Sequence, residues 1–218
     1  MHWIDPDHLP ETTGVVDCFL LNGEGEADGL ALKDGTEVHF PPHMGSDVLA
    51  AVRPGSTVQV RGVRPRGVAM VAAVSIAPEE GARIVDAGPP EDDEGRKAAR
   101  KQAHTKRTAM EAQGVVRQLL HGPKGEVRGV VLQDGRSGRF PPHAAQDLAA
   151  MLVPNASVLL RGEGLVTPHG TIIAVREVGM SADDLRPVEA KKPKDKHKDH
   201  KPHRAGPREG NPDAAHQL

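Results

Sequence analysis

The chain has 218 residues, a formal net charge of −2 and few aromatic residues, namely one Trp, three Phe and no Tyr. Its single cysteine, Cys18, excludes an internal disulfide, and no apolar run approaches the roughly 20 residues needed to cross a bilayer. Because the N-terminus also lacks a basic segment followed by an apolar one, these features predict a cytoplasmic protein that is not inserted in a membrane.

An internal duplication is the main feature of the sequence. The stretch Phe40-Pro41-Pro42-His43 recurs as Phe140-Pro141-Pro142-His143, and 20 of the 49 residues from 14 to 62 are identical to the residue 100 positions later. Agreement of this extent predicts two copies of one small domain. Because aromatic residues are rare, each copy is expected to build its core mainly from aliphatic side chains.

Residues 1–13 are expected to form an extended arm, and residues 14–78 the first repeat. β-forming residues predict strands at 14–21, 29–33, 36–40, 57–62 and 68–76. Asp34-Gly35 predicts a hairpin between the second and third strands. Pro41 and Pro42 end the third strand because proline has no N–H to offer a sheet, and a short helix is predicted at 44–52.

Residues 113–180 predict the same elements, with Asp134-Gly135 at the hairpin. Residues 79–112 read as a charged linker, acidic in its first half and basic in its second, with a helix expected at 96–112. Residues 181–218 are rich in Lys, His and Pro and are expected to be a disordered tail. Between 186 and 208 there are nine bases and three acids, whereas the repeats are nearly balanced. The strong positive charge therefore belongs to the connecting segments.

Three strands, a helix and two more strands are the element order of the OB-fold, a five-stranded barrel. The repeats resemble OB-fold modules in this order and in their Asp-Gly, Phe-Pro-Pro-His and Arg-Gly landmarks, and the tandem arrangement is similar to uncharacterised bacterial OB-fold proteins. The expected fold class is all-β with short helices: two small five-stranded OB-like barrels plus a disordered linker and tail. The resemblance implies that the barrel exterior binds single-stranded nucleic acid with low specificity.

The sequence contains no set of residues typical of an enzyme. It has no metalloprotease, Walker or dinucleotide-binding motif, and Cys18 has Gln118 at the equivalent position. We therefore expect a non-enzymatic binding module without a cofactor. His43 and His143 stand at predicted helix starts, where each either ties the turn to the backbone or stays neutral and able to accept or ligate. The rings of Phe40 and Phe140 are expected in the cores.

Strand alternation assigns a set of basic side chains to the barrel exteriors, where a groove of bases tracks phosphates. The predicted nucleic-acid-binding residues are Lys33, His39, Arg61, Arg64, Arg66, Arg139, Arg161 and His169. Arginine stacks on bases as well as pairing with phosphates, which partly compensates for the scarcity of aromatic rings. The basic linker and tail either add salt-sensitive attraction to DNA or RNA or serve only to keep the chain soluble.

Two further functions remain open from the sequence. The first is a protein-interaction or scaffold module, which the scarcity of aromatic residues and the balanced charge of the repeats favour. The second is transition-metal binding by the tail, because His197, His200 and His203 recur every third residue and would share one edge of a polyproline II helix. Neutral imidazoles at this spacing suit Ni²⁺, Cu²⁺ or Zn²⁺. The oligomeric state does not follow from these patterns.

Overall fold

The computed structural model of the chain describes residues 4–89, 94, 95, 97, 101, 106–122, 124–141, 144, 148 and 151–188. Pro142, His143 and the predicted metal-binding histidines (His197, His200 and His203) lie outside the described residues. None of the helices in the described ranges is long and apolar enough to span a membrane.

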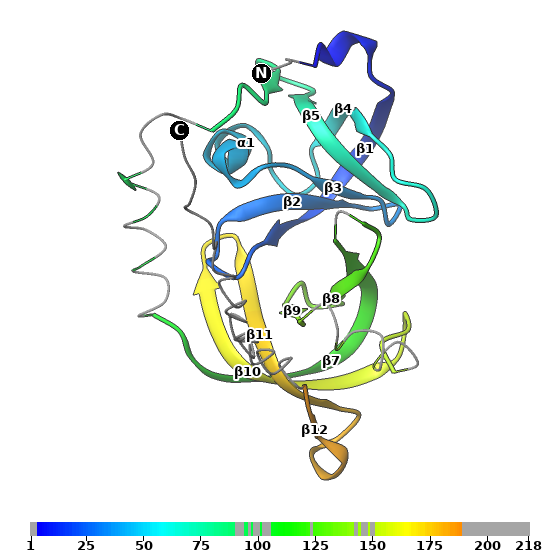
Figure 1. Ribbon diagram of the computed structural model, residues 1–218, viewed down its shortest axis with the longest axis vertical. Coiled ribbons are helices and arrows are strands. Elements are labelled where there is room, and N and C mark those ends of the chain that lie inside the picture. Colours follow the sequence, from blue (N-terminus) through cyan, green and yellow to red (C-terminus); the bar gives the residue numbers. More distant parts are fainter. Residues whose placement is uncertain are drawn as a thin grey trace, which may run out of the picture.

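The first repeat forms a closed five-stranded barrel (Figure 1). Its strands are β1 (Glu11–Leu21), β2 (Ala27–Leu32), β3 (Glu37–His39), β4 (Thr57–Val63) and β5 (Met70–Pro78). β1 pairs in antiparallel fashion with both β2 and β4, and the parallel pairing of β3 with β5 closes the barrel. This connectivity confirms the OB-like fold predicted from the element order.

The second repeat has the same topology. Its barrel strands are β7 (Thr108–His121), β8 (Val127–Leu132), β9 (Ser137–Arg139), β10 (Ser157–Thr167) and β11 (Gly170–Gly179). The parallel pair is β9 with β11, at positions 100 residues beyond β3 and close to 100 beyond β5. The duplication in the sequence is therefore a duplication of the barrel.

Three predicted boundaries differ from the structure. β1 begins at Glu11, after a short 3-10 helix at Pro6–His8, so the arm is shorter than expected. β7 begins at Thr108, so residues 108–112 are strand and do not end a linker helix, because they pair with β10.

The third difference concerns the end of each repeat, where an extra strand extends the sheet. β6 (Ile84–Val85) pairs with β5, and β12 (Arg186–Pro187) follows the 3-10 helix Ala182–Asp184 and pairs with β11. Val188, next along the chain, is 8% exposed and belongs to the second core. Residues 181–188 therefore belong to the second barrel and not to the expected tail.

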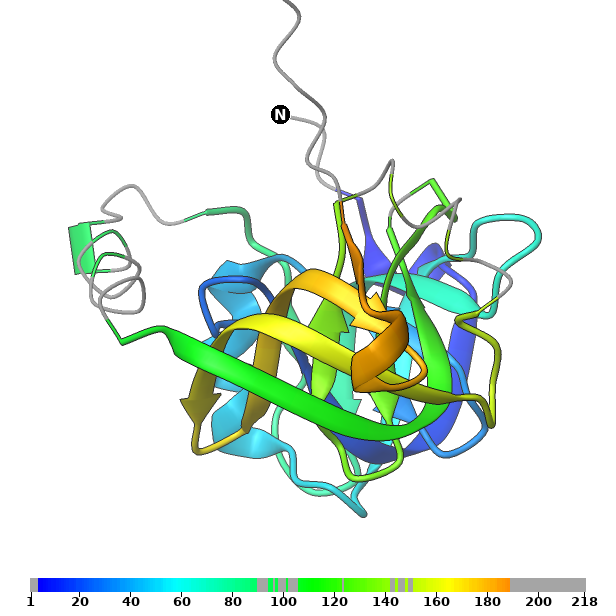
Figure 2. The same ribbon diagram turned by 90° about the horizontal axis from the view of Figure 1, so that it is seen from below.

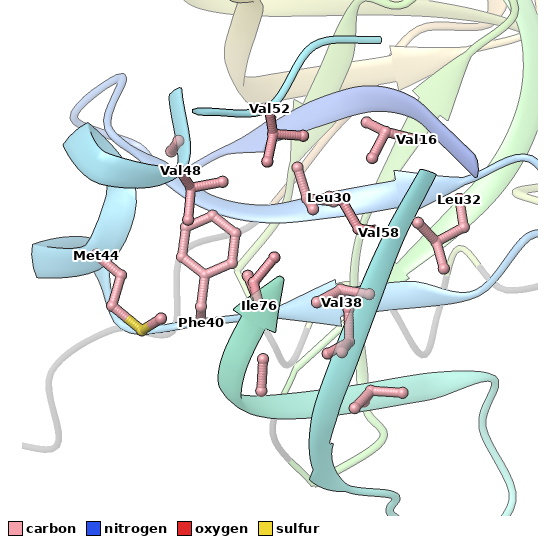
Figure 3. Packing of buried hydrophobic residues seen from close by; sticks show 14 of the residues in the cluster. Val16, Leu30, Leu32, Val38, Phe40, Met44, Val48, Val52, Val58 and Ile76 are labelled. Carbon is pink, nitrogen blue, oxygen red and sulfur yellow. The ribbon is translucent and has the colours of Figure 1, made fainter. Parts of the chain in front are cut away.

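The phenylalanine of the repeated Phe-Pro-Pro-His motif belongs to the core of each barrel, as Figure 3 shows for Phe40 in the first. The ring of Phe40 is 4% exposed and lies beneath helix α1 (Gly45–Ala51), near Met44, Val48 and Ile76. Phe140 is 5% exposed in the second core. Both phenylalanines are thus confirmed as core residues, and the short helix plugs one end of the first barrel.

Left-handed backbone explains some of the repeated turn residues. Gly35 and Gly135 have φ of 87° and 85°, which fits the predicted Asp-Gly hairpins. Gly55 has φ of 93°, and its counterpart Asn155 has φ of 69°. Asparagine tolerates this region better than other residues with a side chain, so the turn survives the substitution between copies.

Candidate functional site

The two barrels pack against each other through their first hairpins (Figures 1 and 2). A buried cluster joins Leu20 and Ala31 of the first barrel to Leu120 and Val131 of the second. These residues occupy equivalent positions in the two copies, so the contact is close to a two-fold arrangement within one chain. We call this contact the inter-barrel interface.

Hydrophobic contacts from the second barrel's last hairpin extend the inter-barrel interface. Leu165 and Ile172, from β10 and β11, pack into the hydrophobic cluster of the first barrel. At the turn of this hairpin, the ring of His169 meets Phe19 edge to face, with centroids 5.7 Å apart. The ring of Phe19 is therefore engaged within the chain.

A buried carboxylate of the first barrel holds the end of β7. Glu37 is 2% exposed and accepts hydrogen bonds from the backbone N–H of His121 at 2.9 Å and from its Nδ1 at 2.5 Å. His39 Nε2 lies 3.0 Å from the same carboxylate. Burial alone raises the pKa of Glu37, but the hydrogen bonds from His121 and His39 outweigh burial and leave that pKa below its ordinary value. The bond to Glu37 raises the pKa of His121, against the opposing effect of burial.

A second polar contact crosses the inter-barrel interface at Arg139. Its Nε and Nη2 donate to the carbonyl oxygen of Leu21 at 3.1 and 2.8 Å, and Nη2 also lies 3.1 Å from Asp28 Oδ1. Burial raises the pKa of Asp28, and the Arg139 guanidinium offsets this only in part. His39 and Arg139 occupy the same position in the two copies. Arg139 binds the last residue of the other barrel's first strand, whereas His39 shares the carboxylate of Glu37 with His121, the residue equivalent to Leu21.

A cavity of about 420 Å³ opens between the barrels beside these contacts. Its lining residues are Asp28, His39, Phe40, Pro41, Pro42, Val63, Ala72, Ala73 and Val74 from the first barrel and His121, Arg128 and Arg139 from the second. The first barrel thus supplies a mainly apolar floor, and the second supplies a basic wall. Arg128 is paired with Glu126 at 2.9 Å, and its side chain is 42% exposed.

The two copies differ at the positions that line this cavity. Leu21, Asp28 and His39 of the first repeat are matched by His121, Arg128 and Arg139 in the second. Each replacement adds a basic group or a more basic one, which gives the cavity its basic wall. Sequence reasoning missed His121 and did not select Arg128, although a comparison of the copies residue by residue carries the signal.

Of the eight predicted nucleic-acid-binding residues, only His39 and Arg139 line the cavity. Arg61 and Arg161, at equivalent positions, are held by Glu11 and Glu111, each at 2.8 Å. Arg161 is also 3.3 Å from Glu177. These two arginines balance a carboxylate on the neighbouring strand, so their charge is largely offset.

The remaining predicted residues are dispersed. Arg64 donates to Thr12 Oγ1 at 2.6 Å, Lys33 and Arg66 are exposed in turns, and His169 contacts Phe19. The structure does not bring these side chains together into one groove.

His43, from the repeated motif, also has a structural partner. Its Nε2 lies 2.7 Å from Asp86 Oδ1, so the imidazole donates to a carboxylate and ties the turn after β3 to the segment after β6. Among the described residues, no three His, Cys, Asp or Glu side chains are grouped as a metal site. The chemistry available at the cavity is therefore hydrogen bonding and charge pairing beside an apolar surface.

No protein-family model and no curated protein matches this chain. Among solved structures, it is similar to the wild-type single-stranded DNA binding protein from Thermus aquaticus and to a deletion mutant of that protein, with 14% sequence identity in both cases. The wild-type match covers 83% of this chain and 95% of the other with a TM-score of 0.24. The mutant match covers 84% and 96% with a TM-score of 0.23. The OB-like fold of each barrel rests on its own strand pairing and not on this likeness.

Proposed function

We propose that this protein is a non-enzymatic module that binds single-stranded nucleic acid, and that the strand crosses the cavity between the barrels. The observation that carries the proposal is the basic wall of the second barrel facing the apolar floor of the first. Single-stranded nucleic acids need both surfaces, because the backbone is anionic and the faces of the bases are apolar.

The inter-barrel interface limits the positions at which a nucleic-acid strand can bind. OB-folds commonly use the face of strands two and three, with the loops between strands one and two and between strands four and five. Here the first loop of barrel one is covered by the second barrel, since a Cβ built on Gly25 would lie 2.6 Å from Leu165 Cδ2. The cavity lies beside this face, because Asp28 of β2 and His39 of β3 line it. Val63, which also lines it, has 52% of its surface exposed.

The test is fluorescence anisotropy with a labelled single-stranded oligonucleotide at low salt. The wild-type chain should bind, and the logarithm of the affinity should fall with the logarithm of salt by roughly 0.7 for each phosphate contacted. Arg128→Glu should weaken binding about tenfold or more, because it reverses a charge at the cavity.

The matched control is Arg176→Glu, which makes the same substitution on β11, at a side chain that is 63% exposed, pairs with a glutamate as Arg128 does and does not line the cavity. This variant should bind nearly as well as the wild type. Equal losses in both variants would remove the cavity from the proposal, and an absence of binding at low salt would remove nucleic acid altogether.

A peptide is the second candidate ligand, and the apolar floor is the observation that favours it. Pro41, Pro42 and Val63 offer a surface for an aliphatic side chain of an extended segment. A stoichiometric protein partner that stays bound after nuclease treatment, and that Val63→Asp releases, would favour this function over nucleic-acid binding.

A further inference from the structure

We propose that the cavity holds one nucleotide unit in a fixed orientation, with its phosphate on the second barrel and its base on the first. This inference rests on the proposed function and specifies the chemical unit that the cavity recognises. The volume of the cavity, about 420 Å³, falls within the range of about 300–1,000 Å³ that is usual for small-molecule sites.

The phosphate position follows from the donors of the second barrel that remain available. Arg128 uses Nε and Nη2 on Glu126, and in the described part of the chain its Nη1 has no partner. His121 also lines the cavity and uses Nδ1 on Glu37, and its Nε2 has no partner among the described residues. Because the pKa of His121 is raised, this nitrogen is more often protonated than in a free histidine. Arginine and histidine N–H groups are typical donors to a phosphate, and Arg128 and His121 line the same cavity.

Three carboxylates lie beside the basic residues of this wall and offset their positive charge. Glu126 pairs with Arg128, Glu37 lies against His121, and Asp28 pairs with Arg139. These charges nearly cancel at the cavity, so a bare phosphate gains little there. A ligand that also covers the apolar floor gains more, which favours a nucleotide over a simple anion.

The base position follows from the floor of the first barrel. Pro41, Val63 and Ala72 present apolar atoms with no side-chain donor or acceptor, a surface suited to the flat face of a base. Asp28 and Arg139 also line the cavity, and their ion pair offers an acceptor beside a donor. In the described residues, Nη1 of Arg139 has no partner. Such a pair complements the mixed donors and acceptors on the edge of a base.

The experiment titrates AMP, CMP, GMP and UMP separately into the full-length protein while amide chemical shifts are recorded by NMR. Ribose 5-phosphate and inorganic phosphate are the control ligands. At least one nucleotide should bind saturably and shift the amides of Val63, Ala72, His121 and Arg128. The control ligands should bind at least about tenfold more weakly, because they leave the floor exposed.

Variants test the orientation. Arg128→Glu should weaken nucleotide binding about tenfold or more and should have a smaller effect on the corresponding nucleoside, which lacks the phosphate. Val63→Asp should weaken the binding of nucleotide and nucleoside alike, and Arg176→Glu should change neither. If inorganic phosphate binds as well as the nucleotides, or if Arg128→Glu has no effect, the inference is wrong.

The two proposals fail separately. An oligonucleotide that binds while no mononucleotide perturbs the cavity would overturn the inference and keep the proposed function. A mononucleotide that binds while no oligonucleotide does would keep the cavity assignment and overturn the proposed function.

Discussion

Asp17 and Arg117 occupy the same position in the two copies of the repeat, carry opposite charges and bind each other across the inter-barrel interface. Asp17 Oδ2 lies 2.5 Å from Arg117 Nη1, and Arg117 Nη2 donates to Cys18 Sγ at 2.9 Å. Burial raises the pKa of the Cys18 thiol despite this guanidinium. Two identical barrels would place like charges at this point, so the divergence of the copies makes each barrel the partner of the other.

Arg117→Asp should therefore destabilise the folded chain, because it places two carboxylates together. The side chains are 26% and 31% exposed, so the loss should be about 1–2 kcal/mol, between the values for exposed and buried pairs. Urea unfolding measures this loss in the free energy of unfolding. The swapped variant, Asp17→Arg with Arg117→Asp, should recover much of the loss.

An exposed pair provides the control for this prediction. Arg176 and Glu163 are 3.6 Å apart with side chains 63% and 51% exposed, so Arg176→Asp should cost far less. A swapped variant no more stable than Arg117→Asp would show that the two charges are not coupled.

The contact between Glu37 and His121 predicts how stability depends on pH. The pKa of His121 is raised in the folded state. Its contribution to folding stability is therefore fully present below its unfolded pKa of about 6.5, and it is lost as pH rises through the raised folded pKa. The pKa of Glu37 is lowered in the folded state. Its contribution to folding stability is therefore present above its unfolded pKa of about 4.3, and it is lost as pH falls through the lowered folded pKa. Stability should thus decline from slightly acidic to mildly alkaline pH.

The other copy supplies the residues for a test of this pH dependence. Ser137 and Leu21 stand at the positions equivalent to Glu37 and His121. In the double variant Glu37→Ser with His121→Leu, the midpoint of urea unfolding should depend less on pH between about pH 6 and 8 than in the wild type. His121→Leu alone should be less stable than the double variant, because the buried carboxylate loses the imidazole donor and keeps only the backbone N–H of residue 121 and His39. An unchanged pH profile in the double variant would assign the effect to other groups.

The fold was largely predictable because its signals are local. Asp34-Gly35 marks a hairpin by its backbone preference, Pro41 ends a strand because it lacks an N–H, and Phe40 follows the alternation of the strand into the core. Each signal lies within a few residues of the feature it predicts. The duplication then supplies a second, independent instance of each.

The site was less predictable because it depends on contacts between distant segments. Leu20 and Ala31 lie on the outer face of their barrel, and alternation alone does not distinguish a surface in solvent from one covered by a second barrel. Arg61 was predicted to be available, but its partner Glu11 lies in a segment predicted as an arm. Glu111 stands 100 residues after Glu11, so the repeat extends beyond its predicted start, and this spacing was the overlooked signal.

Close approach of a neighbouring strand explains why glycine recurs in the Arg-Gly pair, at Gly62 and Gly162. Each follows a register shift between the fourth and fifth strands of its barrel. A Cβ at these positions would lie 2.1 Å from the carbonyl oxygen of Ala72 and 2.0 Å from that of Ala174. Gly62→Ala should therefore destabilise by several kcal/mol in urea unfolding, because backbone must move.

Gly35→Ala is the control for the glycine prediction. Its φ of 87° strains alanine, but nothing lies within 4 Å of the added carbon. The cost should be about 1 kcal/mol, from backbone conformation alone. Similar losses in both variants would contradict the role assigned to close approach at Gly62.

The basic tail should change how strongly nucleic acid binds, but not where it binds. A chain that ends at Val188 keeps the last core residue of the second barrel and loses the eight lysines and arginines between 191 and 208. Anisotropy titrations of this shortened chain should show weaker binding at low salt and a shallower salt dependence, because fewer phosphates are neutralised. Arg128→Glu should still reduce the remaining affinity, since the cavity is intact. If truncation alone abolishes binding, the tail is the binding element, and the cavity contributes nothing to the affinity for nucleic acid.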